Sequence, residues 1–325
     1  MLVPVLLFAL GLVLLIKGGD WFVDGATGIA QRFHVPDLII GATVVSIGTT
    51  LPEVMVSATS ALTGHGEIAY GNAIGSIICN TALIAAITVA VRPCPVDRDS
   101  LKTPVLFFFV SAAIYCLNAY LTGYFSRVLG VVMLLLFALY MYLTIRQGFR
   151  NPAPPEEAAA GEPENSKGNS MGKDILLLVV GAALVAVGAD LLVDNGTLIA
   201  KALGVPESVI ALTFVALGTS LPELVTAITS LAKGHGALSL GNVIGANIFN
   251  LVLVCGVSMT LAPFRIPQSS TIRGINASLV LDIPLMLFVM AFLTLPALAK
   301  RKLSRYQGVV LLILYAAFCA IQFTM

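Results

Sequence analysis

Apolar residues fill most of the chain in stretches of about 20 residues, with short polar breaks between them. At 1.5 Å per residue, a helix of this length crosses the roughly 30 Å of hydrocarbon in a bilayer. A backbone in lipid must satisfy its own hydrogen bonds, and these stretches lack the alternation of membrane barrel strands. The pattern predicts an all-α polytopic membrane protein with ten transmembrane helices, at residues 3–30, 37–62, 67–91, 104–121, 126–146, 173–200, 206–232, 237–261, 278–298 and 305–323.

Composition agrees with this interpretation. Hydrophobic residues make up 58% of the 325 residues and charged residues only 11%, with a mean hydropathy of +0.96. Soluble domains carry about 25% charged residues, so a water-soluble globule is excluded. The net charge of +1 and the lack of a basic patch give no reason to expect nucleic acid. The five cysteines show no paired spacing and are expected to be buried packing residues.

One long polar segment divides the chain into two copies of one unit. Residues 151–172 are rich in Pro, Glu and Ala and are predicted to be a linker between units at 1–150 and 173–325. At a constant offset of 170 residues, GTTLPE (48–53) recurs as GTSLPE (218–223), and GNAIGSIICN (71–80) recurs as GNVIGANIFN (241–250). Each unit holds five predicted spans, an odd number, so the second must enter the membrane from the opposite side. The sequence therefore predicts two inverted five-helix repeats, with a site near the midplane between them.

Loop charges indicate the orientation. Most lysines and arginines follow the first, third, fifth, seventh and ninth spans. By the positive-inside rule these loops and the linker are expected to be cytoplasmic, with both termini outside. The N-terminal stretch lacks the basic region and cleavage pattern of a signal peptide and is expected to be the first span. We expect a multi-pass protein of the (inner) cell membrane.

The repeated glutamates carry the clearest chemical signal. Glu53 and Glu223 occupy equivalent positions deep within the second and seventh predicted spans. A carboxylate at that depth costs several kcal/mol unless it has partners, and such residues usually mark ion pathways. A protonated or internally paired structural glutamate is the alternative, and the repetition argues against it.

A proline precedes each glutamate. Pro52 and Pro222 are expected to break their helices, because proline lacks an amide donor and clashes with the preceding turn. Freed carbonyls, nearby hydroxyls and the two carboxylates would form an all-oxygen cluster, which suits Ca²⁺ and Na⁺ better than zinc or copper. Its members, besides the glutamates, are the hydroxyls of Thr49, Thr50, Thr219 and Ser220 and the carbonyls near Ser46 and Ala216.

The second motif supplies neutral polar groups. Asn80 and Asn250 lie near the middle of the third and eighth spans, where an amide oxygen ligates a cation without adding charge. The glycines of this motif are read either as part of a site or as positions of close helix packing, at Gly71, Gly75, Gly241 and Gly245.

Other polar residues of the repeats give weaker signals. Asp20, Asp24 and their counterparts Asp190 and Asp194 either face an aqueous path or pair across the bundle with Lys17 and its neighbours. The histidines of the two GHG sequences, His65 and His235, are expected to be exposed turn residues.

The two motifs, duplicated and inverted, resemble the α-repeats of the cation/calcium exchanger superfamily, and most closely the bacterial sodium/calcium antiporters. The resemblance covers essentially the whole chain. It implies ten helices, no cofactor, transported Ca²⁺ and Na⁺, and sliding of the first and sixth spans against the rest. It also implies that Glu53 and Glu223 with the carbonyls of Thr49 and Thr219 bind calcium. Sodium sites would then draw on Ser46, Thr50, Ser76, Asn80, Ala216, Ser220 and Asn250.

Three positions depart from this pattern. Ile77 stands where the second repeat has Asn247, and Ala246 stands opposite Ser76. Some relatives carry aspartate where this chain has Asn250, so the site holds two carboxylates. A charge of −2 balances one Ca²⁺ or two Na⁺, which leaves the stoichiometry open.

The function expected from the sequence is exchange of Ca²⁺ for Na⁺ by alternating access, in a monomer. A Ca²⁺/H⁺ exchanger is the nearest alternative, since protons could neutralise the same glutamates. An intramembrane hydrolase would need a Ser–His or paired-aspartate arrangement, and no histidine lies near either motif. A passive channel is disfavoured by the inverted duplication.

Overall fold

The computed structural model describes residues 2–93, 95–150, 170–203, 218–268, 271–272 and 274–324. Nine helical spans in this part of the chain are long and apolar enough to cross a membrane. The first half contains α1 (Leu2–Phe33), α2–η1–α3 (Asp37–Ile40, Gly41–Val45, Ser46–Leu62), α4–η2–α5 (Gly66–Cys79, Asn80–Ala85, Ala86–Val91), α6 (Arg98–Thr122) and α7 (Arg127–Arg150). The second half contains α9 (Met171–Ala202), the shorter α11 (Leu221–Ala232), α12–η5–α13 (Gly236–Phe249, Asn250–Val254, Cys255–Leu261), η6–α14 (Ser278–Asp282, Ile283–Lys300) and α15 (Arg305–Thr324).

These helices confirm the predicted all-α fold. Eight predicted spans agree with the observed ones to within about four residues, α6 begins at Arg98 rather than at 104, and α11 is the end of the seventh predicted span, 206–232. Residues 204–217 of that span and 151–169 of the linker lie outside the described residues. Two short antiparallel pairs, β1–β2 (Tyr124–Phe125 with Phe264–Arg265) and β3–β4 (Thr271–Ile272 with Ile275–Asn276), join loops.

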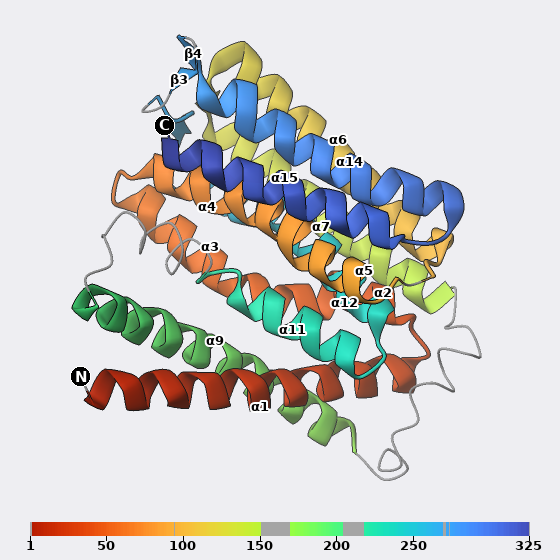
Figure 1. The fold of residues 1–325 in the computed structure, drawn as a ribbon. Helices are drawn as coiled ribbons and strands as arrows, with labels where there is room; N and C mark the ends of the chain where they lie inside the picture. The colour runs from red at the N-terminus through yellow and green to blue at the C-terminus, as the bar shows by residue number, and fades with distance from the viewer. Residues whose placement is uncertain are drawn as a thin grey trace.

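Helices α1 and α9 form a layer of their own along one side of the other helices (Figure 1). They pack along each other more extensively than any other pair of elements. A Cβ at Gly11 would lie 2.9 Å from the Gly188 carbonyl, and one at Gly18 would lie 3.0 Å from the Gly181 carbonyl. The glycines therefore allow the two backbones to touch, which fixes the two helices as one unit.

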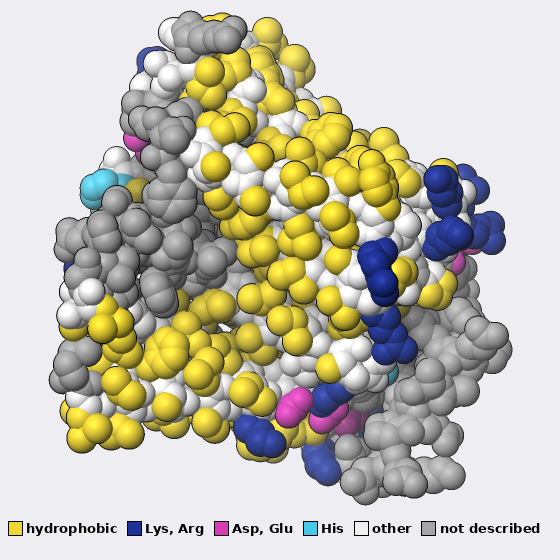
Figure 2. Space-filling model, viewed as in Figure 1, with side chains coloured by type: hydrophobic (Ala, Val, Ile, Leu, Met, Phe, Trp, Pro, Cys, Tyr) yellow, Lys and Arg dark blue, Asp and Glu magenta, His cyan; other side chains and the backbone are white. Residues whose placement is uncertain are grey.

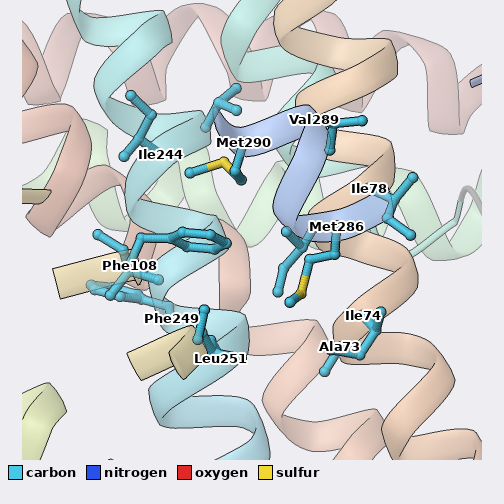
Figure 3. Close-up of a cluster of buried hydrophobic side chains, with 14 of the residues drawn as sticks. Ala73, Ile74, Ile78, Phe108, Ile244, Phe249, Leu251, Met286, Val289 and Met290 are labelled. Carbon is cyan, nitrogen blue, oxygen red and sulfur yellow. The ribbon is translucent and has the colours of Figure 1, made fainter. Parts of the chain in front are cut away.

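The remaining helices enclose the main apolar core. Figure 3 shows part of it, where side chains of α4, α6, α12 and α14 meet, among them Ile74, Phe108, Phe249 and Met290. Gly41 and Gly241 hold α12 close to the second span, since a Cβ on either would approach the facing backbone to less than 2.5 Å. This packing brings the GTTLPE segment of one repeat against the GNVIG segment of the other.

The expected helix break at Pro52 is wrong. Helix α3 runs through Pro52, and the irregular part of this span is the π-helical turn η1, which ends one residue before Ser46. In the second repeat Pro222 lies in the first turn of α11, after a turn at residues 218–220. That position needs no amide donor, so the proline begins a helix there. Two further π-helical turns begin at Asn80 and Asn250. Such turns are frequent at functional sites.

Basic side chains gather at one end of the bundle (Figure 2). This basic end holds the ends of α1, α11 and α14, with Arg32, Lys233 and Lys300, and both termini lie towards the other end (Figure 1). The end of α7, at Arg150, and the start of α9, at Met171, flank the linker, and both helix ends are also at the basic end. The two repeats are thus inverted with respect to each other.

Candidate cation site

Two glutamates from opposite repeats meet in the interior. Glu53 follows Pro52 in α3, Glu223 follows Pro222 in α11, and neither has any exposed surface. Their carboxylates are close enough to repel each other. No hydrogen bond of normal length and angle reaches any of the four carboxylate oxygens from the described residues. Two uncompensated charges in the protein interior are very costly, so this arrangement requires a cation or protons.

Hydroxyl groups surround the carboxylates. Those of Thr49 and Thr50 lie beside Glu223, and Ser220 and Ser76 face each other at 3.5 Å between their Oγ atoms. The Thr50 hydroxyl is buried and has no hydrogen-bond partner in the described part of the chain. The sequence prediction grouped Thr49, Thr50 and Ser220 with Thr219, whereas Ser76 was implied by the family resemblance.

The two predicted asparagines are equally buried. Asn80 is the first residue of η2 and Asn250 the first of η5, and both are fully enclosed. Neither amide oxygen nor amide nitrogen of either residue finds a partner among the residues described. Buried amides are almost always hydrogen-bonded, so each such exception needs an explanation, and the binding of an ion is one of the usual ones.

Two further asparagines, outside the predicted site, hold the threonines. The Thr49 hydroxyl donates to Asn242 Oδ1 at 3.2 Å, and the Thr219 hydroxyl donates to Asn72 Oδ1 at 3.2 Å. The two bonds are equivalent under the repeat, and each crosses from one repeat to the other. The sequence signal for these two bonds was that Asn72 and Asn242 occupy equivalent positions of the repeats. An asparagine within a helix is not by itself evidence of a ligand.

The other predicted site residues are placed as follows. The Ser46 hydroxyl is buried beside the site and lies 2.8 Å from the Gly41 carbonyl and 3.0 Å from the Asn242 carbonyl, either of which can accept its single proton. Thr219 lies in the turn before α11, and Ala216 lies outside the described residues. Gly241 and Gly245 are close-packing positions, as one of the two interpretations held. For Gly71 and Gly75, no described atom would lie within 4 Å of an added Cβ.

The acidic and histidine pairs of the repeats behave differently in the two halves. Asp20 and Asp24 pair with Lys233 of α11, with Nζ–Oδ1 distances of 3.6 and 2.7 Å, rather than with Lys17. His65 is exposed as expected, but His235 is not, because its Nδ1 lies 2.7 Å from Asp37 Oδ2 at the basic end. These contacts lie away from the buried glutamates and join layers of the fold.

The site has the character of a hard-cation site. It offers oxygen atoms and two negative charges, and the described residues contain no cluster of three or more His, Cys, Asp and Glu side chains. The α1–α9 layer covers one side, where a cavity of about 10 Å³ is lined by Phe22, Thr49, Pro52, Val185 and Pro222, among others. Inverted repeats around a buried ion site are the plan of secondary transporters.

Comparison with known proteins identifies the family. Residues 3–146 and 173–324 match the sodium/calcium exchanger protein family, and the chain belongs to it. An uncharacterized membrane protein of Methanocaldococcus jannaschii is 35% identical over 95% of this chain and 94% of its own. Sodium/calcium exchanger MaX1 of Methanosarcina acetivorans is 29% identical, over 98% of both chains. A structure of the sodium-calcium exchanger NCX_Mj, soaked with Na⁺ and Sr²⁺, superposes with a TM-score of 0.79 at 33% identity and covers 98% of both chains. The protein is therefore a multi-pass integral membrane protein of a cation antiporter family.

Proposed function

We propose that this protein exchanges Ca²⁺ for Na⁺ across the membrane by alternating access. Glu53 and Glu223 would be the central ligands, joined by the carbonyls of Thr49 and Thr219 when Ca²⁺ is bound. Sodium would use the same carboxylates together with Ser46, Thr50, Ser76, Asn80, Ser220 and Asn250, and the carbonyl of Ala216.

One observation carries the proposal. Two fully buried carboxylates, one from each repeat, face each other without a hydrogen-bond donor or cation among the described residues. Moving them through a closed, dry state while charged is strongly unfavourable, so only the loaded site would change its exposure. One Ca²⁺ neutralises both charges, and two Na⁺ do the same. This coupling through charge is the physical basis of exchange.

The surrounding amides favour sodium over protons as the counter-ion. A proton binds a carboxylate oxygen and needs no further ligands. A metal ion requires a coordination shell. Oxygen atoms without a hydrogen-bond partner among the described residues would supply it, namely the amide oxygens of Asn80 and Asn250 and the hydroxyl of Thr50. A Ca²⁺/H⁺ exchanger remains the second candidate, because the same carboxylates could be neutralised by protons.

The moving part would be the α1–α9 layer. Its two helices touch backbone to backbone through glycines, whereas its contact with the rest of the bundle is looser. An apolar groove of about 720 Å³ lies between α9 and α3, lined in part by Leu51, Pro52 and Ala182. We propose that this layer slides as a unit, that the basic end is cytoplasmic, and that one chain suffices because both halves of the site come from it.

The test is ⁴⁵Ca²⁺ uptake into proteoliposomes loaded with Na⁺, with and without an outward Na⁺ gradient, for the parent and for Glu53→Gln. Uptake that follows the Na⁺ gradient and is lost in the variant is the expected result. Leu51→Ala, in the adjacent groove, is the matched control and should keep exchange. Uptake that ignores Na⁺ and follows a pH gradient would favour the proton exchanger, and conductance of single channels would identify a passive pore.

A further inference from the structure

The asparagines that bind the two threonines are built into the centre of the fold. Asn242 has no exposed surface and accepts a hydrogen bond from Thr49 at its Oδ1, at 3.2 Å. Asn72 accepts from Thr219 and also donates, through Nδ2, to the Glu53 carbonyl at 3.2 Å and the Ser57 hydroxyl at 2.8 Å. Each asparagine therefore joins its own helix to a glutamate-bearing segment of the opposite repeat.

These bonds determine which oxygens remain free for a cation. Thr49 and Thr219 each offer one hydroxyl and one carbonyl. Because its proton is donated to an asparagine, each hydroxyl is held in one orientation with its lone pairs still available, and the backbone that carries the carbonyl is held with it. The Glu53 carbonyl is committed to Asn72, so Glu53 contributes its side chain alone.

The two asparagines make different numbers of hydrogen bonds. The counterpart of Ser57 in the second repeat is Ala227, which has no hydroxyl. Consistent with this, the Nδ2 of Asn242 is buried without a partner in the described part of the chain, whereas that of Asn72 has two. Among the described residues, Asn72 thus bonds to both glutamate-bearing segments, α3 and the turn before α11, whereas Asn242 bonds to α3 alone.

We propose that Asn72 and Asn242 are positioning residues of the cation site, and that Asn72 is the more important of the two. They act through the threonines and the Glu53 backbone and do not themselves touch the ion. This inference rests on the proposed function. Partners that orient the ligands of a metal typically change its affinity 10- to 100-fold when they are removed.

Calcium binding measured by isothermal titration calorimetry on the purified full chain tests the inference. Asn72→Ala is expected to weaken Ca²⁺ binding about 10- to 100-fold, and Asn242→Ala by about tenfold or less. Asn195→Ala is the matched control, since Asn195 is a buried asparagine of α9 bonded to the Leu191 carbonyl. It should change the dissociation constant by less than about twofold, although the melting temperature without Ca²⁺ falls by a similar amount in all three variants.

A partner variant separates positioning from folding. Thr219→Val removes the same hydrogen bond but keeps the Thr219 backbone carbonyl, so it should reproduce part of the loss. Combined with Asn72→Ala it should add little, because both changes break one bond. Should Asn72→Ala not fold, Thr219→Val alone decides, and an unchanged affinity there overturns the inference.

The outcomes distinguish this inference from the proposed function. If the parent binds no Ca²⁺, or Glu53→Gln binds it as well as the parent, the proposed site is wrong and the inference falls with it. If Glu53→Gln abolishes binding while a folded Asn72→Ala keeps the parent's affinity, the inference alone is overturned. An affinity loss in Asn195→Ala as large as that in Asn72→Ala would mean that any buried asparagine has this effect, and would also overturn it.

Discussion

The two repeats agree in their buried glutamates and differ in the side chains that support them. Glu53 and Glu223 are equally buried, and the Thr49–Asn242 and Thr219–Asn72 bonds have the same length. The supporting side chains differ at three positions: Ser76 is matched by Ala246, Ser57 by Ala227, and Lys233 by Thr63.

Two of these differences leave a buried polar group without a partner among the described residues, and the third changes an ion pair. Ser76 faces Ser220, whereas Thr50, the counterpart of Ser220, has a buried hydroxyl without a partner among the described residues. Lys233 binds Asp20 and Asp24, whereas Thr63 bonds within its own turn and to His65. Comparing the repeats thus locates the groups that are free to bind an ion or to change partners, and the following predictions address that comparison.

The largest effect is expected at the carboxylates, where the repeats are equivalent. Glu53→Gln and Glu223→Gln should each abolish Na⁺-driven Ca²⁺ uptake, because one remaining charge cannot balance a divalent cation in a buried site. Uptake in proteoliposomes measures both. If one variant retains more than about a tenth of the parent's rate, the equivalence of the two halves is wrong.

Ile77 and Asn247 form the next comparison. Asn247 donates to Thr81 at 2.7 Å and to Met290 at 3.2 Å, whereas Ile77 lies in the apolar core. Ile77→Asn should destabilise the protein by about 1–3 kcal/mol, because the new amide has no arranged partner. Thermal unfolding in detergent, with Ile77→Val as the control, measures it. A stable Ile77→Asn protein would mean that the core there accommodates a second polar contact.

Ala246→Ser should restore the missing hydroxyl. By analogy with Ser76 and Ser220, the new side chain would face Thr50 and add an oxygen to the site. A hydrogen bond contributes about 1 kcal/mol net, so the apparent Na⁺ affinity should rise about fivefold with little change for Ca²⁺. The Na⁺ dependence of Ca²⁺ release measures this effect, and Ala246→Gly is the control. An unchanged Na⁺ dependence would show that Thr50 does not contribute to a sodium site.

The smallest effect is expected for Lys233→Thr, which makes the basic end resemble the other end. Lys233, at the end of α11, is 27% exposed and joins it to α1 of the α1–α9 layer. Partly exposed ion pairs contribute about 0.2–1 kcal/mol, so the balance between the two states should shift by about two- to fivefold. Accessibility of a cysteine introduced at Val225, which faces Gly19 of α1, measures the shift. High salt should produce the same shift in accessibility in the parent. If neither Lys233→Thr nor high salt changes the accessibility, this ion pair has no role in the balance between the two states.

The sequence was sufficient for most of the fold. Continuous apolar stretches of the required length predicted the helix ends, since lipid allows few alternatives to a helix. The duplication predicted that Glu53 and Glu223 would meet, because equivalent positions of inverted repeats face each other. Composition could not predict that α1 and α9 form a layer. Their packing depends on particular glycines that face each other, on two helices far apart in the sequence.

The local backbone was harder to predict. Proline was expected to break the helix, but Pro52 is accommodated within α3, and the irregularity appears as η1 instead. The π-helical turns at Asn80 and Asn250 have no local sequence signal, since they depend on packing against other helices. Asn72 and Asn242 were matched in the repeats yet excluded from the site, because their partners are contributed by the opposite half of the chain.

The π-helical turns also change which way a span faces. A π-helical turn holds an additional residue, so the part of the helix that follows is rotated by roughly 100° relative to an unbroken α-helix. Before η2, α4 packs against α3 beside the glutamates, and after it α5 packs against α15. The second repeat does the same, since α12 packs against α11 and α13 against α7. One span can thus present its polar side towards the glutamates and, beyond the π-helical turn, an apolar side to a different neighbour.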